Sequence, residues 1–160
     1  EEARLVGSLL ARAGYRVCSG GYGGTMEGVS RGAKEAGGFT IGVTTRWFSH
    51  LKANPWIDEE ILTETYQDRL NQLIATGAAY LAVHGGVGTL TEISLVWSLL
   101  QTHSLENRPF VLLSRPWQAL LTLAQESLIT RPGDLAIPLL ADTPDEAVRL
   151  INTGLRGNKP

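Results

Sequence analysis

The sequence predicts an α/β protein with a doubly wound parallel sheet that carries helices on both faces. Short apolar stretches alternate with longer stretches of helical spacing along the chain, which is typical of a parallel sheet covered by helices. The 160 residues fit one domain over residues 1–160, and a hydrophobic content of 43% is enough for a core. Neither a low-complexity segment nor a linker interrupts this pattern.

The first half of the chain opens with apolar residues at helical spacing, which end at Gly14. A doubly wound sheet normally opens with a strand at its centre. We therefore expect the opening strand to be missing from this sequence. The predicted elements are a helix at 1–12, a strand at 15–19, a helix at 25–36, a strand at 39–43, an irregular segment at 44–58 and a helix at 60–76.

The second half continues the alternation of strands and helices. Pro116 lies at an early helix position, Pro138 favours an edge strand, and Thr143 begins a helix that runs to about residue 151. The predicted elements are strands at 79–83, 109–113 and 135–140, helices at 90–101, 116–128 and 143–151, and a frayed tail at 154–160.

Two glycine-rich turns share one pattern, G-G-x-G-x-x-x-E. Residues 20–27 (GGYGGTME) align with residues 85–92 (GGVGTLTE), and each turn lies between a predicted strand and a predicted helix. In a parallel sheet, both helix N-termini would face one crevice and attract an anion such as a phosphate. The alternative is two tight turns without a ligand. The candidate phosphate- or nucleotide-binding residues are Gly20, Gly21, Gly23, Gly24, Gly85, Gly86, Gly88 and Thr89.

The common nucleotide motifs do not match these turns. A P-loop needs Gly-Lys-Ser/Thr, and no lysine follows either turn. The dinucleotide pattern G-x-G-x-x-G meets Met26 in the first turn and Thr91 in the second, where it needs its third glycine. ATP hydrolysis and NAD chemistry are therefore poorly supported.

Composition excludes several classes of function. The formal net charge is -2 without a basic face, so we expect no nucleic-acid partner. No apolar run approaches the ~20 residues of a membrane helix, and no signal peptide is evident, so we expect a cytoplasmic protein. Cys18 is the only cysteine and is expected to be a small core residue. His50 and His103 have no neighbours at metal-ligand spacing, so no metal site is expected.

The motifs resemble those of the LOG (Lonely Guy) family, which has long been mislabelled as lysine decarboxylases. The stretch SGGYGGTMEGVSRGAKEAGG is similar to the first glycine motif of that family, and GGVGTLTE is similar to the core of its P-G-G-x-G-T-x-x-E signature. Arg69 lies at the family's spacing before that signature. The resemblance implies a Rossmann-like fold over most of the chain, to about residue 130. No lysine lies in a recognisable pyridoxal-phosphate context, so lysine decarboxylation is not supported.

The resemblance also implies an activity and its residues. LOG proteins are nucleoside 5′-monophosphate phosphoribohydrolases, which cleave AMP-like or cytokinin nucleotides into a free base and ribose 5-phosphate without a cofactor. Arg69 and Glu92 match the catalytic pair of the family, and the family forms homodimers, so a homodimer or higher homo-oligomer is expected. His84, Leu70 and Thr91 depart from its pattern. The alternative is a non-catalytic carrier of a nucleotide or a molybdopterin-type cofactor.

The chemistry suits these residue types. N-glycoside hydrolysis passes through a cationic sugar, which a carboxylate such as Glu92 could stabilise or supply with an oriented water. The planar guanidinium of Arg69 suits phosphate. Glu92 could instead cap its helix in a box with Thr89.

Other polar residues have simpler interpretations as well. Arg69 could lie on a solvated helix face beside Asp68 or Glu64. His84, Glu27 and Arg46 are possible ligand contacts, with a turn residue, a helix-start charge and a solvated cation as the respective alternatives. Trp47 and Trp56 could cover a base or serve in packing.

Overall fold

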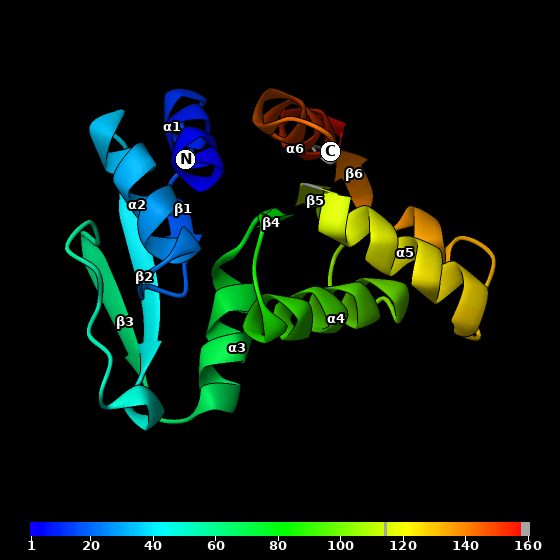
Figure 1. Ribbon diagram of the computed structural model, residues 1–160, viewed down its shortest axis with the longest axis horizontal. Coiled ribbons are helices and arrows are strands. Elements are labelled where there is room, and N and C mark those ends of the chain that lie inside the picture. Colours follow the sequence, from blue (N-terminus) through cyan, green and yellow to red (C-terminus); the bar gives the residue numbers. More distant parts are fainter. Residues whose placement is uncertain (114, 158–160) are drawn as a thin grey trace. The chain divides into compact units, whose positions relative to one another are not determined.

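The computed structural model describes residues 1–113 and 115–157, and the chain divides into two compact units, Glu1–Gly77 and Ala78–Pro160. Each unit contains a three-stranded parallel sheet with helices packed on it (Figure 1). The α/β class and the parallel strands predicted from the sequence are confirmed. The single domain over residues 1–160 stays a prediction.

The sheet of the first unit has the order β1-β2-β3. Cys18 of β1 pairs with Ile41 of β2, and Val43 of β2 pairs with Ile61 of β3. All six residues of β2 are buried, because β2 is the middle strand. The elements are α1 (Glu2–Arg12), β1 (Val17–Ser19), α2 (Thr25–Glu35), β2 (Thr40–Thr45), a 3-10 turn at Arg46–Phe48, β3 (Glu59–Thr63) and α3 (Tyr66–Thr76).

Helices α1 and α2 lie side by side and touch through glycines (Figure 1). A Cβ added to Gly7 would lie 2.0 Å from the carbonyl oxygen of Val29, and one added to Gly32 would lie 1.8 Å from that of Arg4. The two backbones therefore approach more closely than any side chain would allow. Both helices end as predicted, with Gly14 (φ +87) and Gly37 (φ +80) in the left-handed region.

The predicted helix at 60–76 is wrong in its first third. Residues Glu59–Thr63 form β3, and α3 begins only at Tyr66. Thr65 fixes this start, because its hydroxyl accepts from the amide of Asp68 while the carboxylate of Asp68 accepts from the amide of Thr65. β3 lies at the edge of its sheet beside β2 and has three exposed residues, so its apolar pattern is weak.

The sheet of the second unit has the order β4-β5-β6. All four residues of β5 are buried, with exposed fractions of 2% or less, so the middle strand is the core of this unit. The elements are β4 (Tyr80–Ala82), α4 (Val87–Gln101), β5 (Phe110–Leu113), α5 (Arg115–Ser127), a 3-10 turn at Asp134–Ala136, β6 (Leu139–Ala141) and α6 (Pro144–Gly157).

Helix α4 begins three residues earlier than the sequence predicts. Gly86 is its N-cap, in an extended conformation, and no side chain caps it. Thr89 is therefore the third residue of the helix and cannot be its N-cap. The predicted capping box of Thr89 and Glu92 is wrong, and Glu92 lies in the second turn of α4.

The last described residues are more ordered than predicted. Only the last two residues of the strand expected at 135–140 are in a strand, β6, which begins after Pro138 and ends at Ala141. β6 lies at the edge of its sheet. Helix α6 continues to Gly157, so the predicted fraying does not apply to residues 154–157, and residues 158–160 lie outside the described chain. Gly154 allows α6 to pack closely against Pro109, because a Cβ at this position would lie 2.5 Å from Cγ of Pro109.

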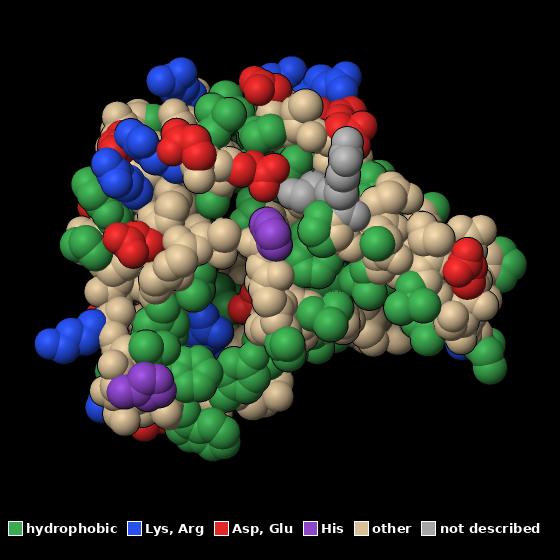
Figure 2. Space-filling model, viewed as in Figure 1, with side chains coloured by type: hydrophobic (Ala, Val, Ile, Leu, Met, Phe, Trp, Pro, Cys, Tyr) green, Lys and Arg blue, Asp and Glu red, His purple; other side chains and the backbone are tan. Residues whose placement is uncertain are grey.

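The surface of the second unit carries hydrophobic side chains over α5 and the segment that follows it (Figure 2). Leu123 is 57% exposed, Leu128 is 63% exposed and Ile129 is fully exposed. Within the described residues, no helix combines the length and the apolar character that crossing a membrane requires.

Candidate functional site

The first glycine turn connects β1 to α2 and is folded inward at its start. Gly20 and Gly21 are buried, and the amide of Gly21 donates to Oγ of Ser19 at 3.2 Å. Gly21 has φ +79, and a Cβ there would lie 3.1 Å from Cα of Gly42 in β2. A side chain at Gly21 would therefore strain the turn and push it away from the sheet.

Arg69, the candidate catalytic arginine, is buried beneath this turn with only 5% of its surface exposed. Its Nε donates to the carbonyl oxygen of Val43 at 2.8 Å, and its Nη2 donates to that of Gly20 at 3.1 Å. A Cβ on Gly20 would lie 1.9 Å from Nη2, so any side chain at this position would displace the guanidinium of Arg69. The solvated helix face considered for Arg69 is wrong, because the residue is buried. Of its two suggested partners, Asp68 caps α3 and Glu64 pairs with Arg46.

Asn54 holds the same turn from a second direction, although the sequence did not single it out. Its side chain is 7% exposed, and its Nδ2 donates to the carbonyl oxygens of Gly21 at 3.1 Å and Tyr22 at 3.0 Å. Its backbone amide also donates to Gly21 at 2.8 Å. Because Oδ1 of Asn54 accepts from the amide of Trp56, this one side chain connects the irregular segment to the glycine turn.

Tyr22 forms the apolar part of the turn. It is 5% exposed, its hydroxyl accepts from the amide of Thr45 at 2.9 Å, and its ring lies 5.9 Å from that of Phe48. The guanidinium carbon of Arg69 lies 5.5 Å from the ring centre, within the range of a cation–π contact. Tyr22 therefore ties the turn to the carboxyl end of β2.

The outer part of the turn is exposed. Gly23 and Gly24 face solvent, and Gly24 (φ +71) is the N-cap of α2. Glu27 lies in the first turn of α2, where the helix dipole stabilises a carboxylate. Its Oε2 would lie 3.9 Å from a Cβ at Gly23, so the carboxylate borders the exposed glycines.

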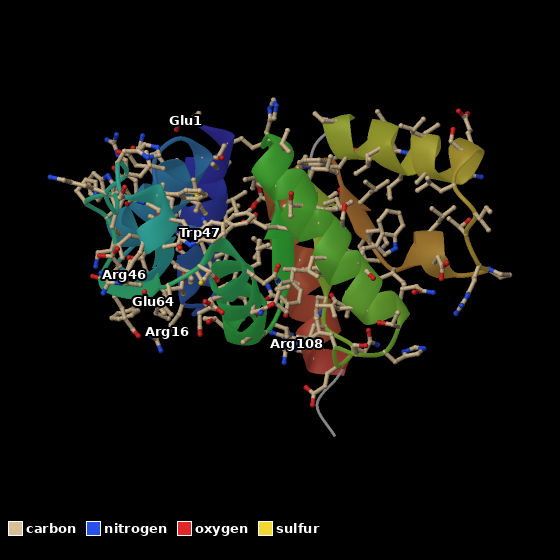
Figure 3. All side chains as sticks on the ribbon, turned by 90° about the horizontal axis from the view of Figure 1, so that it is seen from below. Glu1, Arg16, Arg46, Trp47, Glu64 and Arg108 are labelled. Atoms are coloured by element: carbon tan, nitrogen blue, oxygen red, sulfur yellow. The ribbon has the colours of Figure 1, made fainter. Side chains whose placement is uncertain are left out.

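Arg46 follows β2 and forms an exposed ion pair with Glu64, with 2.9 Å between Nε and Oε1 (Figure 3). Beside it, Trp47 is 66% exposed, whereas Trp56 lies beneath the guanidinium of Arg31. Trp47 is therefore the more accessible of the two tryptophans considered for covering a base.

The second glycine turn, between β4 and α4, is open to solvent. His84, Gly86 and Gly88 are exposed, and a Cβ at either glycine would meet no atom within 4 Å. Gly85 is constrained, because its Cβ would lie 2.1 Å from Oγ1 of Thr89. No acidic residue lies in the first turn of α4, so no carboxylate of that turn offsets the positive end of the helix dipole.

Trp117 fixes the strand end that leads into this second turn. It is 6% exposed, and its indole Nε1 donates to the carbonyl oxygen of Val83 at 3.1 Å. Glu92 is half-buried on α4, beyond the turn. The sequence did not identify Trp117, because an anchor from a later helix leaves no trace in local periodicity.

Cys18 lies in β1, just before the first turn, and is half-buried. Burial raises the pKa of its thiol to about 11, against the weaker opposing effect of Arg69. The thiol is therefore protonated near neutral pH and is a poor nucleophile. Within the part of the chain that is described, no three histidine, cysteine or carboxylate side chains gather as metal ligands would.

These features define an α/β protein of the Rossmann-like class, with a glycine turn at the start of a helix in each unit. The chain belongs to the SLOG cluster4 family, whose model matches residues 1–128. The resemblance to LOG proteins seen in the sequence is thereby confirmed.

Two curated relatives are named cytokinin riboside 5′-monophosphate phosphoribohydrolase. The chain is 36% identical over 100 residues to the one from Mycobacterium marinum, covering 61% of this chain and 54% of the relative. It is 33% identical over 121 residues to the one from Mycobacterium tuberculosis, covering 73% and 63%. The chain thus spans less than two-thirds of the length of these relatives.

Solved structures of cofactor-binding proteins have the same fold. The molybdenum cofactor binding protein of Rippkaea orientalis matches with a TM-score of 0.77 and 26% identity, over 95% of this chain and 85% of that one. The molybdenum cofactor carrier protein of Chlamydomonas reinhardtii matches with a TM-score of 0.74 and 25% identity, over 97% and 86%. The comparisons therefore include both named enzymes and named carriers.

Proposed function

We propose that this protein is a nucleoside 5′-monophosphate phosphoribohydrolase that cleaves AMP-like or cytokinin nucleotides into a free base and ribose 5-phosphate. The observation that carries the proposal is the second turn: an open, glycine-capped helix start is followed in the next helical turn by a half-buried carboxylate, Glu92. The names of the mycobacterial relatives support the same reaction.

The 5′-phosphate is assigned to the N-terminus of α4. Gly86 and Gly88 leave room for close approach of an anion, and the helix has no acidic residue of its own in the first turn. The first turn differs, because Glu27 lies beside Gly23 and would repel a phosphate there. The first turn is therefore the less favourable of the two turns for a phosphate.

Glu92 acts on the sugar in the proposed reaction. As the bond between the anomeric carbon and the base nitrogen breaks, its electron pair leaves with the base, and the ribose gains positive charge. The carboxylate stabilises this charge and accepts a proton from the attacking water, while the departing base takes up a proton. Within the first unit, Arg69 holds the first turn in place through Gly20.

Incubation with AMP and related monophosphates, followed by chromatography of the free base, tests the proposal. Glu92→Gln is expected to lower turnover about 100-fold or more, since a positioned general base contributes that much. The helix should remain intact, because Glu92 is not part of its cap. Glu126→Gln in α5, an exposed position, removes the same charge and should leave turnover unchanged.

Binding without cleavage is the second candidate function, as a carrier of a nucleotide or a molybdopterin-type cofactor. The high TM-scores to the two molybdenum cofactor proteins favour it. Retained binding of a nucleotide without base release from any purine or pyrimidine monophosphate would support the carrier. Turnover that survives Glu92→Gln would instead reject the proposed role of Glu92.

A further inference from the structure

We infer that Asn54 is a positioning residue for ligand binding at the first glycine turn, because its side chain holds carbonyl groups of that turn in place. This inference rests on the proposed function for the identity of the ligand. The turn has three consecutive carbonyl groups, those of Gly20, Gly21 and Tyr22, and each accepts a hydrogen bond from a buried side chain. Asn54 supplies two of these bonds and Arg69 supplies the third.

The direction of these bonds determines which groups the turn presents. Within one peptide group, the carbonyl and the amide point in opposite directions. Because the carbonyls of the turn point toward the protein interior, the exposed part of the turn consists of Gly23, Gly24 and the amides that begin α2. Without the side-chain amide of Asn54, the carbonyl of Tyr22 would lose this buried donor, and that of Gly21 would keep only the backbone amide of residue 54. The turn would then rotate to find other partners.

Asn54 is suited to this task because it is held in place itself. Its Oδ1 accepts from the amide of Trp56, and this bond orients the amide plane so that both hydrogens of Nδ2 point at the turn. Further along the same segment, Thr40 of β2 holds the backbone through the carbonyl oxygen of Trp56 at 2.5 Å and the amide of Asp58 at 3.0 Å. The segment is therefore anchored twice, and only the anchor at Asn54 reaches the turn.

The variant Asn54→Asp tests this inference. The aspartate side chain keeps the shape and the acceptor for Trp56 but cannot donate to Gly21 or Tyr22, so the turn retains only the backbone bond from residue 54 to Gly21. We expect the affinity for AMP and for ribose 5-phosphate, measured by calorimetry, to fall about tenfold or more, which corresponds to one or two lost hydrogen bonds. If the enzyme turns over AMP, KM should rise more than kcat falls. If Asn54→Asp does not fold, Asn54→Ala takes its place.

Thr40→Val is the matched control, because it removes the other anchor of the same segment without touching the turn. Both variants are expected to lower thermal stability, but only the change at Asn54 should weaken ligand binding and shift the amide resonances of Gly20–Gly24. Equal loss of affinity in both variants, or wild-type affinity in Asn54→Asp, would overturn the inference.

The test also separates this inference from the proposed reaction. Wild-type protein that binds AMP but releases no base would contradict the phosphoribohydrolase, while a loss of binding in Asn54→Asp would still support the positioning role. Base release by the wild type with unchanged affinity in Asn54→Asp would support the phosphoribohydrolase and contradict the positioning role of Asn54. Absence of any binding to the wild type would overturn both.

Discussion

Arg69 combines a structural task with its place in the proposed reaction. A buried guanidinium is tolerated only where its donors are satisfied, and here two of them reach carbonyl oxygens of β2 and of the first glycine turn. The planar arrangement of its nitrogens allows one side chain to reach both. Arg69 thereby connects the start of α3 to the candidate site within the first unit.

The variant Arg69→Lys should therefore lower the free energy of unfolding by about 1–3 kcal/mol, because an ammonium group cannot reach both Val43 and Gly20. Denaturant unfolding measures this loss. Arg46→Lys is the control, since Arg46 lies in an exposed ion pair and the change should stay within about 0.5 kcal/mol. Equal stability of the two variants would show that the buried bonds of Arg69 contribute little.

Cys18 gives a pH-dependent prediction. The pKa of its thiol is raised to about 11 in the folded protein, so above a pH of 9.0, the usual value, the unfolded chain loses a proton that the folded chain keeps. Stability should therefore fall as the pH rises from 9 to 11. Cys18→Ala should reduce this slope in urea unfolding at stepped pH, and an unchanged slope would contradict the assignment.

Local patterns predicted the glycine residues of the candidate site but not their supports. The repeated motif predicted the turns at Gly20–Gly24 and Gly85–Gly88, because clusters of glycine can be recognised in a single sequence. Asn54 and Trp117 could not be found in this way. Their role depends on carbonyl groups 32 or more residues distant, and no spacing rule connects such positions.

At the scale of elements, the contact between α1 and α2 depends on backbone proximity. Because Gly7 and Gly32 have no Cβ, the carbonyl oxygens of Val29 and Arg4 lie where those Cβ atoms would clash with them. A side chain there can be accommodated only if a whole helix moves. An ion pair between Arg4 and Glu35, with 2.5 Å between Nε and Oε2, joins the same helices and lowers the pKa of the Glu35 carboxyl.

Gly32→Ala should therefore destabilise the protein by about 1–3 kcal/mol despite the better helix propensity of alanine. Gly28→Ala on the same helix is the matched comparison, because its Cβ would lie 3.3 Å from Cβ of Ala3 and should change stability by about 1 kcal/mol or less. Thermal unfolding decides between them, and a tolerated Gly32→Ala would argue against the close helix contact.

The start of α3 offers a second prediction at this scale. Thr65→Ala removes the N-cap oxygen that accepts from Asp68 and should cost about 1 kcal/mol in denaturant unfolding. Thr65→Ser keeps the oxygen and should cost much less. If both substitutions have the same effect, the hydroxyl is not the group that stabilises this helix start.

Strong elements were predictable from the sequence, and weak ones were not. Glycines at α1 and α2 marked the helix ends, and the apolar run of β5 marked a buried strand. β3 was missed because an edge strand with exposed residues lacks the alternation of a half-buried strand. The start of α4 was misplaced because a glycine N-cap gives no polar signal, so Thr89 was the more obvious candidate.

At the scale of the whole molecule, the expected homodimer or higher homo-oligomer is still a prediction. Along α4, Ile93, Val96 and Leu100 are buried within the second unit, while three large apolar side chains stay exposed on α5 and just after it. Exposed apolar surface of this kind favours association between subunits. Sedimentation at micromolar concentration should give at least twice the mass of the chain, and a monomeric mass would contradict this.

The single thiol gives a direct measure of motion in the first unit. Because Cys18 is the only cysteine and its thiol stays protonated at neutral pH, a thiol reagent reacts with it slowly while β1 is paired. The labelling rate then reports how often this strand opens, as hydrogen exchange does for amides. A nucleotide that binds only the closed form should slow the labelling in proportion to its occupancy, which makes Cys18 a built-in reporter of ligand binding.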